Sequence, residues 1–470
     1  VELCAECHSD VDSLESLREI RMSGSLHDYD GDGSVEESIA DEISGLQAML
    51  MTAMQAYSAE VAGSAMAYSE TAYPYFFNDL NANGSVDEDE AVRENGFAAW
   101  TARLLQAAYN YQTSLKDTGA FAHNPKYIIQ LLHDSIADLN TVLTTPVDVA
   151  AAVRNDAGHF DGSSEAFRHW DEDGEVENRC ARCHSADGLH TYIANGVNVA
   201  TEISNGFTCS TCHDVANFPA LYTANEATFP SGAKVSFGEG NPANLCLSCH
   251  QGRASTASVN RAIGELGDDE VSEDLNFSNP HYFAAGATMF GSEVQGAYEY
   301  AGETYIGRSP HVELGATCAT CHDTHALTVD TEYCSVCHQG VEDITAIRMT
   351  EGDFDGDTDA TEGLAGEVAT LEAALLVAIQ DYAANTAGAP IGYDAAQYPY
   401  FFGDANANGI YDSDEGGFES WTPTLVRAAY NYQWVQKDPG AYAHNGLYII
   451  QVLFDSLADL GADVTAYTRP

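Results

Sequence analysis

Apolar residues recur at helical spacing in two distant parts of the chain. In the first, four of them lie three or four residues apart, which lines one face of a helix. These residues are Ile39, Ile43, Leu46 and Leu50. Three helices are expected here, over residues 35–62, 100–115 and 126–139. Asn124 stands where the N-cap of the third helix is expected.

The same series returns near the C-terminus, which indicates an internal repeat. The matching stretches are residues 73–84 with 398–409, 107–111 with 428–432, 116–124 with 437–445, and 127–135 with 448–456. The helices expected in the second copy cover residues 364–383, 421–436 and 447–460, with Asn445 as the counterpart of Asn124. Each copy is therefore a helical module of roughly 120 residues.

The segment between the copies lacks sustained periodicity and mixes glycine, asparagine and serine with short apolar runs. It predicts loops and short helices, with little β structure beyond short hairpins, one of them near residues 298–307. We therefore expect a mainly α fold with extensive irregular loops. Three domains are expected, over residues 1–150, 151–333 and 334–470.

The charge of the chain excludes some partners. Its 72 acidic residues outnumber 18 basic ones, for a formal net charge of −54. Such a surface repels nucleic acid and anionic membranes. No apolar run reaches the roughly 18 residues that a membrane-spanning helix needs.

All twelve cysteines fall in six Cys-x-x-Cys-His motifs. They are Cys4/Cys7/His8, Cys180/Cys183/His184, Cys209/Cys212/His213, Cys246/Cys249/His250, Cys318/Cys321/His322 and Cys334/Cys337/His338. The pentapeptide is the attachment signature of c-type haem, with the cysteines as thioether donors and the histidine as proximal iron ligand. A disulfide framework or a zinc site gives no reason for a histidine after every second cysteine. We therefore expect six haems c and a haem-packed core.

A bis-histidine haem needs a second histidine from elsewhere in the chain. The expected distal ligands are His123, His159, His281, His311, His325 and His444. His123 and His444 recur in the repeat, and His444 is expected to serve the haem at His338. His325 is expected to ligate a haem of the middle segment. His169 is the main competitor and His190 a weaker one, whereas His27 and His133 are interpreted as structural.

Two stretches match the twelve-position calcium loop of EF-hands, in which oxygen ligands alternate along the chain. The candidate ligands are Asp79, Asn81, Asn83, Ser85, Asp87 and Glu90, and Asp404, Asn406, Asn408, Ile410, Asp412 and Glu415, with Ser85 and Ile410 contributing carbonyls. A second loop, Asp28, Asp30 and Asp32, matches only the first half, because Ile39 stands at position 12 and Glu36 would have to substitute. Its counterpart is Asp353, Asp355 and Asp357, with Asp359 or Glu362. We expect structural calcium.

With six motifs, the CHDTH segment at 321–325 and His311 upstream of Cys318, the chain resembles the multihaem c-type cytochromes of the surface and exterior of metal-reducing bacteria. The resemblance implies electron transfer to extracellular acceptors, and some six-haem members form filaments. Haem c is attached outside the cytoplasm, so an extracellular or cell-surface location is expected, with the periplasm as an alternative.

The leading hypothesis is an extracellular electron conduit that assembles end to end, because Cys4 leaves its haem little upstream polypeptide to cover it. A second hypothesis is a reductase of nitrogen or sulfur oxyanions with one open haem site, which scarce lysine and arginine disfavour. A third is a calcium-bound structural or adhesion protein that carries haem.

Overall fold

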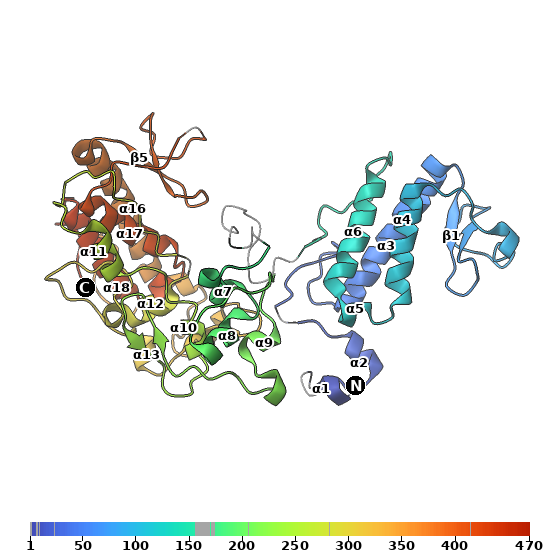
Figure 1. Ribbon diagram of the computed structural model, residues 1–470, viewed down its shortest axis with the longest axis horizontal. Coiled ribbons are helices and arrows are strands. Elements are labelled where there is room, and N and C mark those ends of the chain that lie inside the picture. Colours follow the sequence, from blue (N-terminus) through green and yellow to red (C-terminus); the bar gives the residue numbers. More distant parts are fainter. Residues whose placement is uncertain are drawn as a thin grey trace. The chain divides into compact units, whose positions relative to one another are not determined.

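The chain divides into two compact units, Val1–Gly158 and His159–Pro470. The computed structural model describes residues 2–5, 8, 10–22, 24–155, 170, 174–204, 206–281, 283–413 and 415–470. The fold is mainly helical with many irregular connections, and the strands of the described residues form two-stranded antiparallel sheets, which confirms the expected class (Figure 1). The second unit holds both the middle segment and the second module, and the three-domain division stays a prediction.

The first unit is built on three long helices that lie side by side (Figure 1). Its elements are α1 Glu2–Ala5, α2 Leu14–Arg18, α3 Ile39–Tyr57, β1 Met66–Tyr68, β2 Phe76–Asn78, α4 Ala102–Lys116, α5 Ala120–His123 and α6 Pro125–Asn140. Leu46, Leu50, Leu104 and Leu132 are fully buried between α3, α4 and α6. The apolar periodicity thus marks the packed faces of the helices.

Caps set the helix ends of this unit. Ser38 accepts a hydrogen bond from the Asp41 amide, so α3 begins at Ile39 and not at residue 35 as expected. A π-helical turn, Ser58–Ala62, ends it at Gly63, whose φ of 77° is left-handed. The Asn124 side chain accepts from the Tyr127 amide, which confirms it as the N-cap of α6.

The second module contains the same order of elements. They are α16 Leu364–Tyr382, β5 Ile391–Tyr393, β6 Phe401–Gly403, α17 Pro423–Gln436 and α18 Ala441–Asp459. α18 runs from Ala441 across a kink at Asn445, whose φ of −167° and ψ of 69° match those of Asn124, so a helical segment begins after Asn445 as expected. The Asn445 amide there donates to the Gly307 carbonyl, so a contact with the middle segment replaces free capping.

The middle segment consists of short elements. They are α7 Asn178–His184, α8 Gly188–Asn195, α9 Cys209–Cys212, β3 Ala227–Thr228, β4 Lys234–Val235, α10 Asn244–Leu247, α11 Thr256–Ile263, α12 Ala285–Phe290, α13 Pro310–Glu313, α14 Cys318–Cys321 and α15 Thr331–Cys334. The hairpin expected over residues 298–307 is wrong, because this stretch contains no strand. The Tyr298 N–H and carbonyl are instead bound by the Asn431 side chain.

None of the helices in the described part of the chain combines the length and apolar character needed to cross a membrane.

Candidate haem and cation sites

Each Cys-x-x-Cys-His motif that the structure describes in full is folded as about one helical turn. In five motifs the histidine N–H bonds the carbonyl of the first cysteine, as His322 does to Cys318 at 3.0 Å. The other motif lies within α7. Residues three and four apart share one helical face, so this turn presents both sulfurs and the imidazole together. The eleven cysteines described are all free, which leaves their sulfurs available for thioether bonds.

Four proximal histidines have a second histidine ring in front of them. The ring centroids are 5.8 Å apart for His184 and His281, 6.3 Å for His213 and His325, 6.2 Å for His338 and His311, and 6.4 Å for His322 and His444. A metal–imidazole bond is about 2 Å long and the ring centroid lies about 1 Å behind the nitrogen, so two rings on one ion stand about 6 Å apart. These pairs therefore fit bis-histidine iron.

Hydrogen bonds to the ring nitrogen Nδ1 orient several of these imidazoles. Nδ1 of His213 lies 2.9 Å from the Pro219 carbonyl, and Nδ1 of His250 lies 2.9 Å from the Phe283 carbonyl. A partner on Nδ1 fixes the tautomer and leaves Nε2 as the metal ligand. Burial lowers the pKa of both His250 and His322, which keeps these imidazoles neutral for metal binding.

The repeated histidines carry a carboxylate partner that the sequence reasoning missed. Nδ1 of His444 lies 2.8 Å from Asp438 Oδ1, and Nδ1 of His123 lies 2.8 Å from Asp117 Oδ1. Burial alone would lower the pKa of His444, but the buried Asp438 carboxylate raises it above its usual value. The aspartates stand in the repeated Lys-Asp-x-Gly-Ala segment, so the repeat itself held the signal.

The structure pairs two distal candidates differently from the sequence expectation. His444 faces His322, not His338, and His311 faces His338 instead. The reason is a long-range contact: Nδ1 of His311 lies 3.3 Å from the Ala443 carbonyl, so the N-terminus of α18 brings both histidines to neighbouring sites. His325 faces His213 of the middle segment.

His123, His133 and His190 have no facing histidine ring among the described residues. His159 and His169 lie outside the described residues, and Cys7 of the first motif does too. His190 stacks on Tyr222, with ring centroids 5.6 Å apart. His123 lies beside Asp117 in the first unit, and His133 is half-buried on α6.

Contacts between motifs give the order of the sites in space. Cys249 Sγ lies 3.7 Å from the carbonyl of Arg182, the residue before Cys183, and the side chains of Cys246 and Cys318 also interact. The motifs at His184, His250 and His322 are therefore consecutive neighbours. His325 follows His322 by three residues and faces His213, which places that site beside the same group.

The two EF-hand-like loops adopt the same curled shape. In the first loop Asp79 Oδ2 accepts from the Gly84 amide at 2.7 Å, and the Asn81 and Asn83 amides both reach Asp87. Glu90 is buried and accepts from the Leu80 and Asp87 amides. The second loop repeats these bonds at Asp404, Asn406, Asn408, Asp412 and Glu415. The asparagine amides at positions 3 and 5 thus meet the aspartate at position 9, and the glutamate at position 12 binds the loop backbone.

The half-matching loops hold the tighter carboxylate clusters. Asp30, Asp32 and Glu37 offer oxygens within 4.8 Å of one another, and so do Asp355, Asp357 and Glu362. Glu37 and Glu362, not Glu36 or Asp359, thus complete these clusters. Glu362 is one of the two ligands expected there, whereas Glu37 was missed, although both glutamates stand nine residues after the first aspartate of their loop.

Burial and charge in these loops favour a bound cation. Asp355 is only 4% exposed, and its Oδ2 has no hydrogen-bond partner among the described residues. Burial, followed by repulsion from neighbouring carboxylates, raises the pKa of Glu362 to about 7. The equivalent Glu37 also has its pKa raised to about 7. A hard cation would neutralise this repulsion and take the free oxygen.

A buried ion pair joins each cluster to its first long helix. Glu367 of α16 accepts from the Phe354 and Asp355 amides and pairs with Arg348 at 2.6 Å. In the first unit, Glu42 of α3 accepts from the Tyr29 and Asp30 amides and pairs with Arg21. Three-carboxylate groups form again with these glutamates, namely Asp28, Asp30 and Glu42, and Asp353, Asp355 and Glu367. The buried glutamate of the long helix therefore fixes the backbone of each loop.

Comparison with known proteins gives relatives of one kind. Over 84% of its own length the chain is 26% identical to the C-type polyheme cytochrome OmcC of Geobacter sulfurreducens. Over 65% of its own length it is 27% identical to the C-type polyheme cytochrome OmcB of the same species. These alignments span 59% of OmcC and 48% of OmcB. No family model and no solved structure matches the chain. The chain is a homologue of these C-type polyheme cytochromes, and we identify it as a multihaem c-type cytochrome.

Proposed function

We propose that the chain transfers electrons over long distances through six covalently bound, bis-histidine haems c. The observation that carries this proposal is the set of histidine pairs at the spacing of a shared iron, four of them within the second unit. Two imidazole ligands leave no open iron position, so the haems pass electrons and do not bind a substrate. The cysteines would hold each porphyrin, and the haems would supply the redox chemistry.

The second unit supports a continuous path. The sites at His184, His250 and His322 adjoin through their cysteines, and the site at His338 joins them through His311, which stands seven residues before Cys318. Such a path favours short steps between neighbouring haems. Electrons would leave to external acceptors or to other redox proteins, from a location at the cell surface or outside the cell. The relatives' names place them among polyheme cytochromes, in agreement with this role.

Structural calcium and end-to-end assembly are further parts of the proposal. Calcium would occupy the loops closed by Glu90 and Glu415 and the clusters closed by Glu37 and Glu362. The His8 side chain is exposed, which leaves space for a neighbouring subunit against the first haem. We propose that such contacts build a homo-oligomer or filament.

The test of the proposal is a potentiometric titration of the purified holoprotein, together with its mass and its paramagnetic resonance spectrum. We expect six haems by mass, six-coordinate low-spin iron throughout, and reversible reduction at negative potentials. A stable high-spin ferric signal would contradict bis-histidine ligation of all six. It would favour the alternative of an oxyanion reductase with one open site, with the haem at His250 as the first to examine.

The Asp438 carboxylate should tune the haem held by His444. Replacing Asp438 by asparagine keeps a polar partner near Nδ1 but removes the negative charge that makes the imidazole a stronger donor. We expect Asp438→Asn to raise the potential of one haem by on the order of 60 mV, a tenfold change for a one-electron couple. Protein-film voltammetry measures the shift.

Asp117→Asn is the matched control for that variant. The Asp117 and His123 side chains are 36% and 70% exposed, against 1% and 19% for Asp438 and His444, so water screens the first pair. We expect Asp117→Asn to shift the haem potential less than Asp438→Asn does. Equal shifts for both variants would show that burial of the carboxylate does not set its effect.

A further inference from the structure

The two modules differ in how one helical face is covered. In the first unit this face, here called the α4–α6 face, consists of Leu105, Tyr109, Asn110 and Ser135. The equivalent residues on α17 and α18 are Val426, Tyr430, Asn431 and Ser456. The tyrosine, the asparagine and the serine of this face are identical in both copies.

In the second unit an irregular stretch of the middle segment covers this face. The Asn431 side chain binds Tyr298 twice, accepting from its N–H at 2.7 Å and donating to its carbonyl at 3.0 Å. The Tyr430 hydroxyl donates to the Gly296 carbonyl at 2.7 Å. Val426, Tyr430 and Asn431 have no exposed surface as a result.

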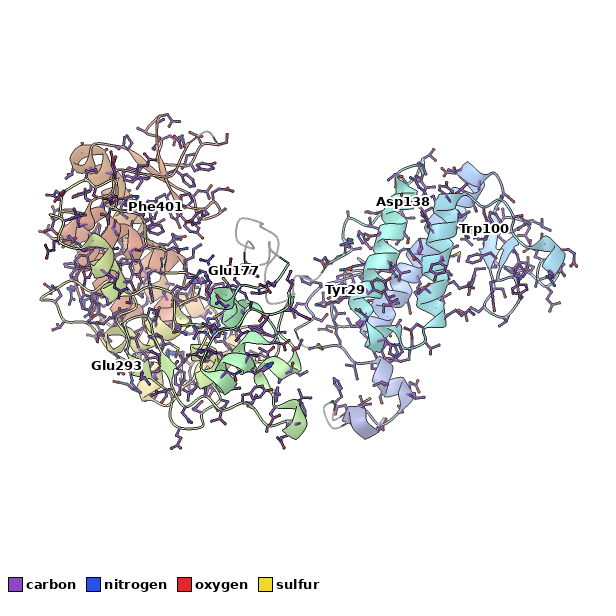
Figure 2. The ribbon with its side chains drawn as sticks, viewed as in Figure 1. Tyr29, Trp100, Asp138, Glu177, Glu293 and Phe401 are labelled. Carbon is purple, nitrogen blue, oxygen red and sulfur yellow. The ribbon has the colours of Figure 1, made fainter. Side chains whose placement is uncertain are left out.

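In the first unit the same face is open. Tyr109 is 73% exposed and Leu105 54%, and they border a groove of about 540 Å³. Figure 2 labels Asp138, which lines this groove from α6. The Asn110 amide already donates to Ser135 Oγ at 3.0 Å, as the Asn431 amide does to Ser456 Oγ at 2.9 Å. The recognition asparagine is thus set in its binding orientation before any partner is present.

We propose that the α4–α6 face docks a partner multihaem chain through a segment equivalent to residues 294–299. The occupant is inferred from the second unit, where the covering segment lies between the motif at Cys246 and the ligand His311 of a haem-bearing region. The backbone of the covering segment supplies the N–H and carbonyl to which Asn110 would hydrogen-bond. A small residue in the segment lets its backbone approach the helices closely. A second copy of this chain is a poor source, because Tyr298 is already buried against its own α17.

Differences between the copies define the partner further. A Cβ on Gly296 would stand 2.5 Å from the Trp434 ring, so only glycine fits the second unit. Thr113 replaces Trp434 in the first unit, which leaves space for a larger partner residue at that position. Arg427 pairs with Asp268, which precedes the covering segment in the chain, but its equivalent in the first unit is the neutral Gln106. The partner of the first unit therefore needs no acidic residue there.

The test uses a fluorescent peptide of residues 285–307 as probe and the full holoprotein as receptor. We expect saturable binding that Asn110→Ala weakens about tenfold or more, since two backbone hydrogen bonds are lost at about 1 kcal/mol each. Asn431→Ala is the matched control and should leave the affinity unchanged. A peptide with Gly296→Ala should bind equally well, because Thr113 makes room for its methyl group.

Three results would overturn the proposal. The first is the absence of saturable binding to the wild-type protein. The second is loss of binding with Asn431→Ala but not with Asn110→Ala, which would mean that the peptide only displaces its own copy in the second unit. The third is concentration-dependent self-association of the wild-type chain that Asn110→Ala abolishes, which would assign the face to a second copy of this chain.

Discussion

Replacing His444 by alanine should convert one haem from six-coordinate low-spin to high-spin iron. His444 faces His322 with ring centroids 6.4 Å apart, and its Nδ1 is held by the buried Asp438, so Nε2 is the expected second ligand of that iron. Loss of one imidazole should also raise the potential of that haem, by on the order of 0.1 V within the roughly 0.8 V that axial ligands span. Electron paramagnetic resonance and resonance Raman spectra measure the change, and added imidazole should reverse it.

The same variant distinguishes the two possible assignments of His444. In a background that lacks the last haem, with Cys334 and Cys337 replaced by alanine, His444→Ala should still create a high-spin haem, because His322 keeps its own. His311→Ala should create none in that background, since the haem at His338 is gone. The reverse outcome would restore the assignment that the sequence order suggests, with His444 serving His338.

This reassignment shows where sequence reasoning on the site stops. The motifs and the Nδ1-bonded, repeated histidines are local features, so their residues could be found from spacing alone. Which distal histidine meets which motif depends on how the start of α18 packs against the stretch around His311, a contact between residues 132 positions apart. Periodicity within a segment carries no information about such a contact.

The same difference between local features and long-range contacts applies to the fold. Apolar spacing located α3, α4 and α6 and their counterparts, because each helix buries one continuous face. The start of α3 differs from the expected residue 35 because the Ser38 side chain accepts a hydrogen bond from the Asp41 amide and caps the helix there. The stretch near Tyr298 was mistaken for a hairpin because its alternating aromatics resemble a strand, although its backbone is bound by the Asn431 side chain.

Similarity to the EF-hand loop does not identify Glu37, which completes the cluster of the first module, whereas Glu362 is one of two ligands expected in the second. The EF-hand pattern depends on position 12, so Ile39 counted against the loop at Asp28. Glu37 and Glu362 reach the aspartates because the loop turns directly into the N-terminus of a long helix. Comparing acidic residues at the same offset in both copies would identify Glu37 as the equivalent of Glu362.

Removing calcium should destabilise both modules. An ion held at 100 times its dissociation constant stabilises the folded state by about 2.7 kcal/mol per site. Each module has two candidate sites, so chelation should lower its unfolding free energy by about 5 kcal/mol. Thermal unfolding followed by circular dichroism, with and without a calcium chelator, measures the loss. An unfolding midpoint that the chelator leaves unchanged would contradict structural calcium.

Substitutions in the EF-hand-like loop separate ion binding from simple loss of charge. Glu90→Gln removes the buried ligand at position 12 and should abolish most of the calcium-dependent stabilisation of the first unit. Glu88→Gln is the matched control, because Glu88 is exposed in the same loop and stands at no ligand position. It should leave the calcium response unchanged. Equal responses in the two variants would mean that net charge, not coordination, governs the effect.

The acidic clusters allow a sharper test, because their variants should change stability in opposite directions with and without calcium. Glu362 is crowded by Asp355 and Asp357, so Glu362→Gln should stabilise the calcium-free module by removing repulsion. With calcium present it should destabilise the module, because a ligand is lost. Glu367→Gln cannot serve this purpose: it leaves the buried Arg348 without its charged partner and costs stability in both conditions. A Glu362→Gln variant that shifts both forms in the same direction would exclude a cation at this cluster.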